Sequence, residues 1–102
     1  MATIRIKAKS TNGITDVKAV MSHTMETGLR KDSKGDKIPA HHITEVVAEH
    51  NGRVVLNANW GISISKNPYL SFKFNGGAPG ETIKISWVDN LGKSDSLEAA
   101  IK

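Results

Sequence analysis

The sequence contains no cysteine, and this absence removes several kinds of chemistry at once. The chain cannot form a disulfide, a thiolate zinc site or an iron–sulfur ligand set, and it has no cysteine nucleophile. Disulfides are also the common reinforcement of small secreted domains. We therefore expect a core of β-structure that is stable without cross-links.

Long apolar segments are absent as well. No apolar run approaches the roughly 18 residues of a membrane-spanning helix. The first ten residues alternate between apolar and basic side chains, whereas a secretory signal needs a continuous apolar core. The chain has 102 residues, of which 38% are hydrophobic and 24% charged, as in a single globular domain. Composition alone predicts a cytoplasmic protein, or one that reaches another compartment by a different route.

Aromatic side chains are few, and the five present fall mostly on predicted apolar strand faces. The formal net charge is +4, which is mildly basic, but the lysines and arginines are spread along the sequence. A nucleic-acid groove needs clustered basic residues interleaved with exposed aromatic residues. We therefore expect no nucleic acid partner, and a solvated surface or a complement to an acidic protein instead.

Alternation of apolar and polar residues with a period of two dominates the chain and predicts β-strands. Asn12-Gly13 and Asn51-Gly52 are typical of tight hairpin turns, the second of type I′. The predicted strands are seven in number, at 3–9, 14–21, 42–50, 54–60, 69–74, 82–88 and 94–101. Residues 97–100 could instead form a helical turn. This pattern predicts one immunoglobulin-like β-sandwich over residues 1–102.

The alternation also predicts which side chains share a face. On the third strand these are Thr44, Val46 and Ala48. On the fourth strand the corresponding set is Val54, Leu56, Ala58 and Trp60.

Residues 22–40 form a long connection without periodicity, and connections of this length are often functional. Methionine is soft and adaptable, and tyrosine and methionine are favoured at interface cores. This connection and the Asn-Pro-Tyr turn at 67–69 predict a partner-binding surface made of Met21, His23, Met25, Glu26, Gly28, Arg30, Asn67, Pro68 and Tyr69. The alternative is that these side chains only cover one end of the sandwich.

Catalysis and metal binding are the competing interpretations of the same loop. A general base needs a nucleophile and an orienting group, and the four histidines have no such set near them in sequence, so we expect no enzyme. Histidine with thioether is a copper(I) ligand set, and the candidate donors are Met21, His23, Met25, Glu26, His41 and His42. Their spacing matches no fixed ligand pattern. The methionines could instead pack the loop onto the sandwich while the histidines cap strand ends.

The same loop carries a family resemblance. Residues 21–32, Met-Ser-His-Thr-Met-Glu-Thr-Gly-Leu-Arg-Lys-Asp, resemble the Met-Ser-His-Pro-Met-Glu-Thr-Gly segment of the SoxZ family. The blocks at 38–41, 50–52, 65–74 and 86–90 continue the likeness in order, over nearly the whole chain. Thr24 departs from the family, which usually has proline there, and this puts only the local rigidity of the loop in doubt.

The resemblance implies a function in bacterial thiosulfate oxidation. SoxZ proteins have an immunoglobulin-like fold and pair with SoxY, whose cysteine lies in a C-terminal Gly-Gly-Cys-Gly-Gly arm and carries sulfur intermediates between other Sox enzymes. The resemblance therefore implies a non-catalytic subunit without a cofactor. It also implies a periplasmic location reached by co-export with SoxY, which replaces the cytoplasmic expectation. An unpaired sheet edge could make the isolated chain self-associate. A copper-binding sandwich remains the alternative function.

Overall fold

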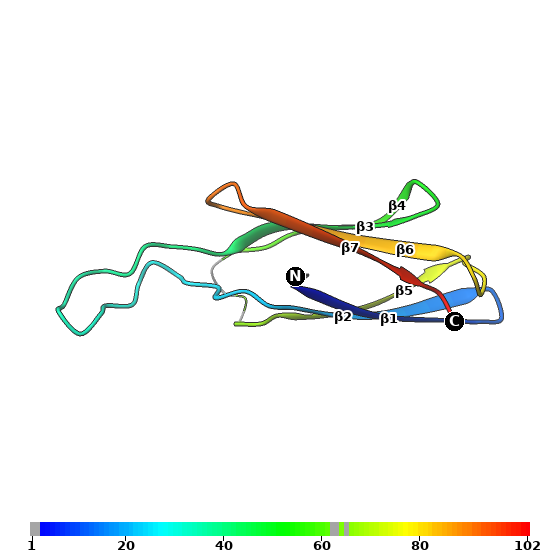
Figure 1. The fold of residues 1–102 in the computed structure, drawn as a ribbon, viewed down its shortest axis with the longest axis horizontal. Helices are drawn as coiled ribbons and strands as arrows, with labels where there is room; N and C mark the ends of the chain where they lie inside the picture. Colours follow the sequence, from blue (N-terminus) through cyan, green and yellow to red (C-terminus); the bar gives the residue numbers. More distant parts are fainter. Residues whose placement is uncertain (1–2, 62–63, 65) are drawn as a thin grey trace.

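The computed structural model describes residues 3–61, 64 and 66–102. These residues form two antiparallel sheets packed face to face (Figure 1). The first sheet has the strand order β1-β2-β5 and the second the order β4-β3-β6-β7. The strands are β1 (Ile4–Thr11), β2 (Ile14–Met21), β3 (Ile43–His50), β4 (Arg53–Asn59), β5 (Tyr69–Asn75), β6 (Thr82–Asp89) and β7 (Ser94–Ala100). The predicted seven-stranded all-β sandwich is confirmed, and the alternative helical turn at 97–100 is wrong.

Three tight turns connect neighbouring strands, and their backbone angles explain the turn residues. Asn12, Gly13, Asn51 and Gly52 all have positive φ, between 51° and 78°. Two successive positive φ angles define a type I′ turn, which matches the twist of a two-residue hairpin. The third hairpin joins β6 to β7 around Gly92, whose φ is 82°. The turns predicted at Asn12-Gly13 and Asn51-Gly52 are therefore confirmed.

The core lies between the two sheets and is formed by alternate residues of the inner strands. Val17, Ala19 and Met21 of β2 are buried against Ile83 and Ile85 of β6 and their neighbours. Each large apolar side chain that is fully buried contributes about 1.5–3 kcal/mol relative to exposure. The two sheets thus share one buried core, which is the source of stability that a domain without disulfides requires.

Two β-bulges change the predicted alternation. A register shift beside Ala48 makes Val55 an extra residue on β4, so that Val54 is 52% exposed while Val55 packs against the core. A second shift makes Thr44 an extra residue on β3, and Ile43 is buried in its place. The predictions that Val54 shares a face with Leu56, and Thr44 with Val46, are therefore wrong, because one extra residue reverses the side-chain direction.

The sandwich is closed along one side and open along the other. β1 packs against β7, whereas the described strands β4 and β5 at the opposite side make no comparable contact. Hydrophobic side chains along this side are only partly buried, namely Val55, Leu56, Trp60, Ile64, Leu70 and Phe72. Across the β3–β4 ladder from Leu56, Ala48 is fully buried. We call the six partly buried residues the open side: Val55, Leu56, Trp60, Ile64, Leu70 and Phe72.

Residues 22–42 leave the sandwich as a long arm, drawn in cyan to green at the left of Figure 1. The arm doubles back on itself, with antiparallel bridges between Glu26 and His41 and between Lys31 and Lys37. At its tip Asp32 accepts hydrogen bonds from the backbone N–H groups of Lys34 and Asp36. This arm gives the molecule its length of 54 Å, against 23 and 20 Å in the other directions. No described segment is a helix long and apolar enough to span a membrane.

Candidate functional site

Three polar side chains from separate parts of the chain meet at the base of the arm. His23 follows β2, His41 precedes β3, and Asp89 ends β6. The Asp89 Oδ2 atom lies 3.1 Å from His23 Nε2 and 2.8 Å from His41 Nε2. The two imidazole rings meet edge to face, with centroids 4.6 Å apart. We call His23, His41 and Asp89 the polar lock, because they hold the two ends of the arm to the second sheet.

The backbone fixes the tautomer of His23. The Met25 N–H donates a hydrogen bond to His23 Nδ1 at 3.0 Å, so this nitrogen carries no proton. The proton of the neutral ring must then be on Nε2, which donates to Asp89. The His23 ring also meets Trp87 edge to face at 5.2 Å. His23 is thus held by its position in the arm, by the carboxylate and by the core.

Asp89 is buried but accepts hydrogen bonds on both carboxylate oxygens. Its Oδ1 atom accepts from the backbone N–H groups of Leu91 and Lys93, at 3.0 and 2.9 Å, within the β6–β7 turn. Burial of Asp89 opposes ionisation, but the bonds from His23, His41 and the two backbone N–H groups outweigh it and lower the pKa of the carboxyl from 3.8 to about 2. The polar lock therefore contains an ionised carboxylate at neutral pH.

The two methionines of the predicted site pack into the sandwich. Met21 is fully buried and Met25 nearly so. Met25 has a positive φ of 49°, which is uncommon for a side chain of this size, and its sulfur accepts a hydrogen bond from the Ile43 N–H at 3.3 Å. The arm is therefore held to the core by methionine packing as well as by the polar lock.

The Asn-Pro-Tyr turn lies directly beside the start of the arm. The Asn67 side-chain oxygen accepts from the His23 N–H at 3.1 Å, and the Asn67 N–H donates to the His23 carbonyl at 3.0 Å. The Pro68 carbonyl accepts from the Met21 N–H at 3.0 Å. The structure thus brings together two segments that sequence analysis had grouped only by residue type.

The predicted site residues differ widely in their exposure. Met21, His23, Met25 and Pro68 are buried, while Glu26 and Gly28 are half-buried. Arg30, Asn67 and Tyr69 are exposed. Arg30 is paired with Glu26, and its hydrogen bond holds the pKa of the Glu26 carboxyl below the usual value. The exposed and half-buried members can contact another protein directly, and the buried ones set the shape of the arm.

The polar lock resembles a metal-ligand set in composition but does not fit one in its hydrogen bonding. A metal bound at His23 Nε2 would require a proton on Nδ1, where the Met25 N–H already points. The thioether of Met21 is fully buried, and that of Met25 is used by the Ile43 N–H. Two of the donors predicted for copper(I), His23 and Met25, are therefore already engaged in hydrogen bonds within the chain.

Asp89 was not among the site residues predicted from the sequence. It lies at the end of β6, where the turn to β7 begins. An aspartate at the first position of a turn often accepts a hydrogen bond from the backbone N–H group two residues later. Nothing in the sequence, however, indicates that its other oxygen faces histidines 48 and 66 positions away.

A comparison with protein families decides the relationship that the sequence blocks suggested. The family model described as Sulphur oxidation protein SoxZ matches residues 4–100. The chain belongs to the SoxZ family. The match spans all seven strands, the arm and all three residues of the polar lock. No individually curated protein matches the sequence. Membership assigns this chain to sulfur oxidation, with a SoxY-type partner implied.

Proposed function

We propose that this chain is the non-catalytic subunit of a sulfur-carrier complex, in which it supports a SoxY-type partner that bears the reactive cysteine. Family membership supports the pathway. The absence of cysteine supports a division of labour between the two subunits. The predicted location, a periplasm reached by export together with the partner, belongs to the same proposal.

The open side of the sandwich is the surface that best suits a permanent partner. Interfaces in stable complexes are more apolar than transient ones and resemble a domain core cut in half. Leu56, Trp60 and Phe72 already pack against the core but remain partly exposed to solvent. A partner that covers them would complete burial that the two sheets leave unfinished between β4 and β5. This incomplete burial is the observation that carries the proposed pairing.

The arm and the neighbouring turn suit a second task, the presentation of the loaded partner to enzymes. The polar lock and the buried methionines fix the base of the arm, while Arg30, Asn67 and Tyr69 remain available for contact. A preorganised loop loses less conformational entropy on binding than a free one. The predicted partner-binding residues therefore act in two ways, the exposed ones by contact and the buried ones by support.

Paired substitutions on one strand test the position of the permanent partner. Leu56→Lys places a charge on the open side, while Val54→Lys places the same charge two residues away on the outer face. We expect Leu56→Lys to weaken the affinity for the SoxY-type partner at least tenfold, because the interface would have to desolvate an ammonium group. Calorimetric titration with the purified partner measures both affinities, and thermal unfolding of each variant checks that the fold survives.

Val54→Lys is expected to change the affinity less than twofold. The open side would be excluded as the interface if both variants lost the same affinity for the partner. It would also be excluded if Leu56→Lys folded normally and lost no affinity.

A further inference from the structure

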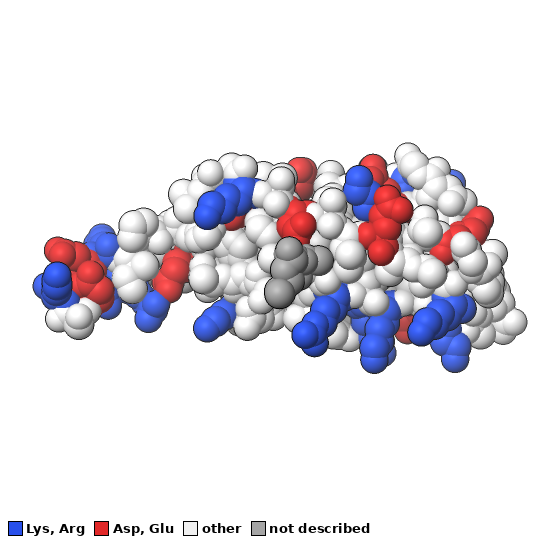
Figure 2. All heavy atoms as spheres, in the orientation of Figure 1, with Lys and Arg blue, Asp and Glu red and all other residues white. Residues whose placement is uncertain are grey.

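The outer face of the three-stranded sheet collects the excess positive charge of the chain. Strand pairing aligns its outward side chains in rows across β1, β2 and β5. The charged members are Arg5, Lys7, Lys9, Asp16, Lys18 and Lys73. We call this surface the basic face. In Figure 2, Lys and Arg side chains gather along the lower edge of the sandwich, where Figure 1 shows these strands.

The charge of the remaining surface is balanced. The whole sequence has fourteen basic and ten acidic side chains. The basic face holds five of the basic side chains and one of the acidic ones. The rest of the chain therefore carries nine of each sign. The outer face of the second sheet is the opposite in character, with Glu45, Glu49 and Glu98 around a single Lys84. Basic residues that are spread along the sequence thus gather on one face, because alternation directs lysines of neighbouring strands to the same side of the sheet.

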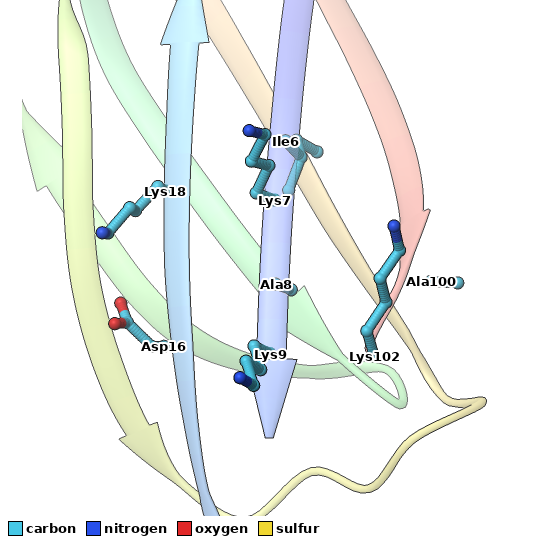
Figure 3. A pocket seen from close by; sticks show the side chains of 8 residues that line it. All are labelled: Ile6, Lys7, Ala8, Lys9, Asp16, Lys18, Ala100 and Lys102. Atoms are coloured by element: carbon cyan, nitrogen blue, oxygen red, sulfur yellow. The ribbon is translucent and has the colours of Figure 1, made fainter. Parts of the chain in front are cut away.

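The arrangement within the basic face works against the stability of the sheet. Lys7 and Lys18 are direct cross-strand partners, and like charges in that position repel each other. Asp16 pairs with Lys9 on one side and Lys73 on the other, so the single carboxylate balances only one end of the face. Lys7, Lys9, Lys18 and Asp16, labelled in Figure 3, line a surface hollow of about 420 Å³ together with Ile6, Ala8, Ala100 and Lys102. An external anionic group would relieve this repulsion.

We propose that the basic face is an electrostatic docking surface for an acidic patch on a protein that meets the carrier complex transiently. Lysines are strongly hydrated, so a permanent interface over them would incur a large desolvation cost. Complementary charge instead raises the rate of encounter, which suits an enzyme that must bind and release its carrier repeatedly. The face is continuous with the exposed Tyr69, which lies in the same row as Arg5 and Val20.

A protein partner fits this surface better than a nucleic acid. Single-stranded nucleic acid binds on basic surfaces where several aromatic rings stack with the bases. Tyr69 is the only aromatic side chain among the outward residues of β1, β2 and β5, and it lies at one end of the face. The proposal rests on the carrier function proposed above, and its test separates the two.

The test compares two single charge reversals in the carrier complex, formed with the purified SoxY-type partner. Lys18→Glu reverses a charge at the centre of the basic face and creates an attractive pair with Lys7, so the fold is not weakened. Arg53→Glu makes the same change in net charge on the second sheet, at the exposed hairpin end of β4. Thiosulfate oxidation is reconstituted from purified components, with the complex as the varied component, at 20 and at 300 mM salt.

We expect Lys18→Glu to lower kcat/KM for the complex about tenfold at low salt and less than threefold at high salt, with kcat unchanged. Arg53→Glu is expected to change it less than twofold. Equal effects of the two variants, or an effect that salt does not reduce, would overturn the proposal. Failure of Lys18→Glu to pair with the partner would also overturn it, by assigning this face to the permanent interface.

Fluorescence anisotropy with a 20-nucleotide oligothymidine tests whether the basic face binds nucleic acid instead. Tight binding at 150 mM salt that is abolished by Lys18→Glu would assign the face to nucleic acid and overturn the proposal. If the wild-type chain does not pair with the SoxY-type partner at all, the proposed carrier function fails before the docking test begins.

Discussion

Asp89 holds the base of the arm with a single carboxylate that accepts four hydrogen bonds. Two come from histidine side chains at the two ends of the arm, and two from backbone N–H groups of the next turn. Only an ionised carboxylate has acceptors for all four donors. This one residue therefore couples the geometry of the arm to that of the β6–β7 hairpin.

Replacement of Asp89 by asparagine should destabilise the fold by about 2 kcal/mol, because the new NH₂ group faces donors that remain buried. Urea unfolding measures the free-energy difference. Asp36→Asn is the matched control, since the Asp36 side chain is exposed at the tip of the arm, and it should change stability by less than about 0.5 kcal/mol. A loss for Asp89→Asn no greater than that of the control would show that the polar lock is not needed for stability.

The lowered pKa of Asp89 predicts a pH dependence with a definite sign. Its pKa is about 2 in the folded chain, against an ordinary value of 3.8, so ionisation favours the folded state. The contribution is complete above about pH 5 and is lost as the pH falls towards 2. It amounts to about 2 kcal/mol.

Unfolding curves of the wild type and Asp89→Asn, recorded at steps between pH 6 and pH 2, measure that contribution. The difference in stability between the two proteins should shrink by this amount across the interval. A difference that stays constant with pH would contradict the assignment.

At the scale of elements, the loop between β5 and β6 is fixed to β2 by close backbone approach. Gly77 has a φ of 83°, and a Cβ atom there would lie 2.1 Å from the Thr15 hydroxyl oxygen. That hydroxyl donates a hydrogen bond to the Gly76 carbonyl at 2.7 Å. The glycine-rich segment is thus a tightly packed connection between the two sheets.

Gly77→Ala should cost about 3 kcal/mol, because it combines backbone strain at positive φ with a displaced buried side chain. Gly61→Ala serves as the comparison, since an added Cβ there meets no neighbour and Gly61 does not have a positive φ. Its stability should stay within about 0.5 kcal/mol of the wild type. Thermal unfolding distinguishes the two, and similar midpoints would show that the loop moves away from Thr15 at little cost.

The same elements show what the sequence can predict. Hairpins closed by Asn-Gly are specified by neighbouring residues, so the strands around Asn12 and Asn51 could be placed from sequence alone. The bulges at Thr44 and Val55 depend on pairing between strands, which local alternation does not reveal. The bond from Asp89 to His23 spans 66 positions and follows only from the packing of the sheets. Local chemistry was therefore predictable, and the contacts that assemble the site were not.

At the scale of the whole molecule, three surfaces have different characters. The open side is partly apolar, the arm projects from one end, and the basic face carries the excess charge. An apolar surface suits a permanent partner and a charged one a transient partner. This distribution is consistent with a subunit that binds one protein stably while presenting it to others.

Native mass spectrometry of the chain, co-expressed with a protein that ends in Gly-Gly-Cys-Gly-Gly and then supplied with thiosulfate and the remaining oxidation enzymes, tests the central claim most directly. We predict a complex with equal numbers of the two subunits, in which sulfur is added to the partner alone, because this chain has no cysteine. Two results would contradict the proposed function. One is recovery of the chain without that partner, and the other is an unaltered rate of thiosulfate oxidation when the chain is omitted.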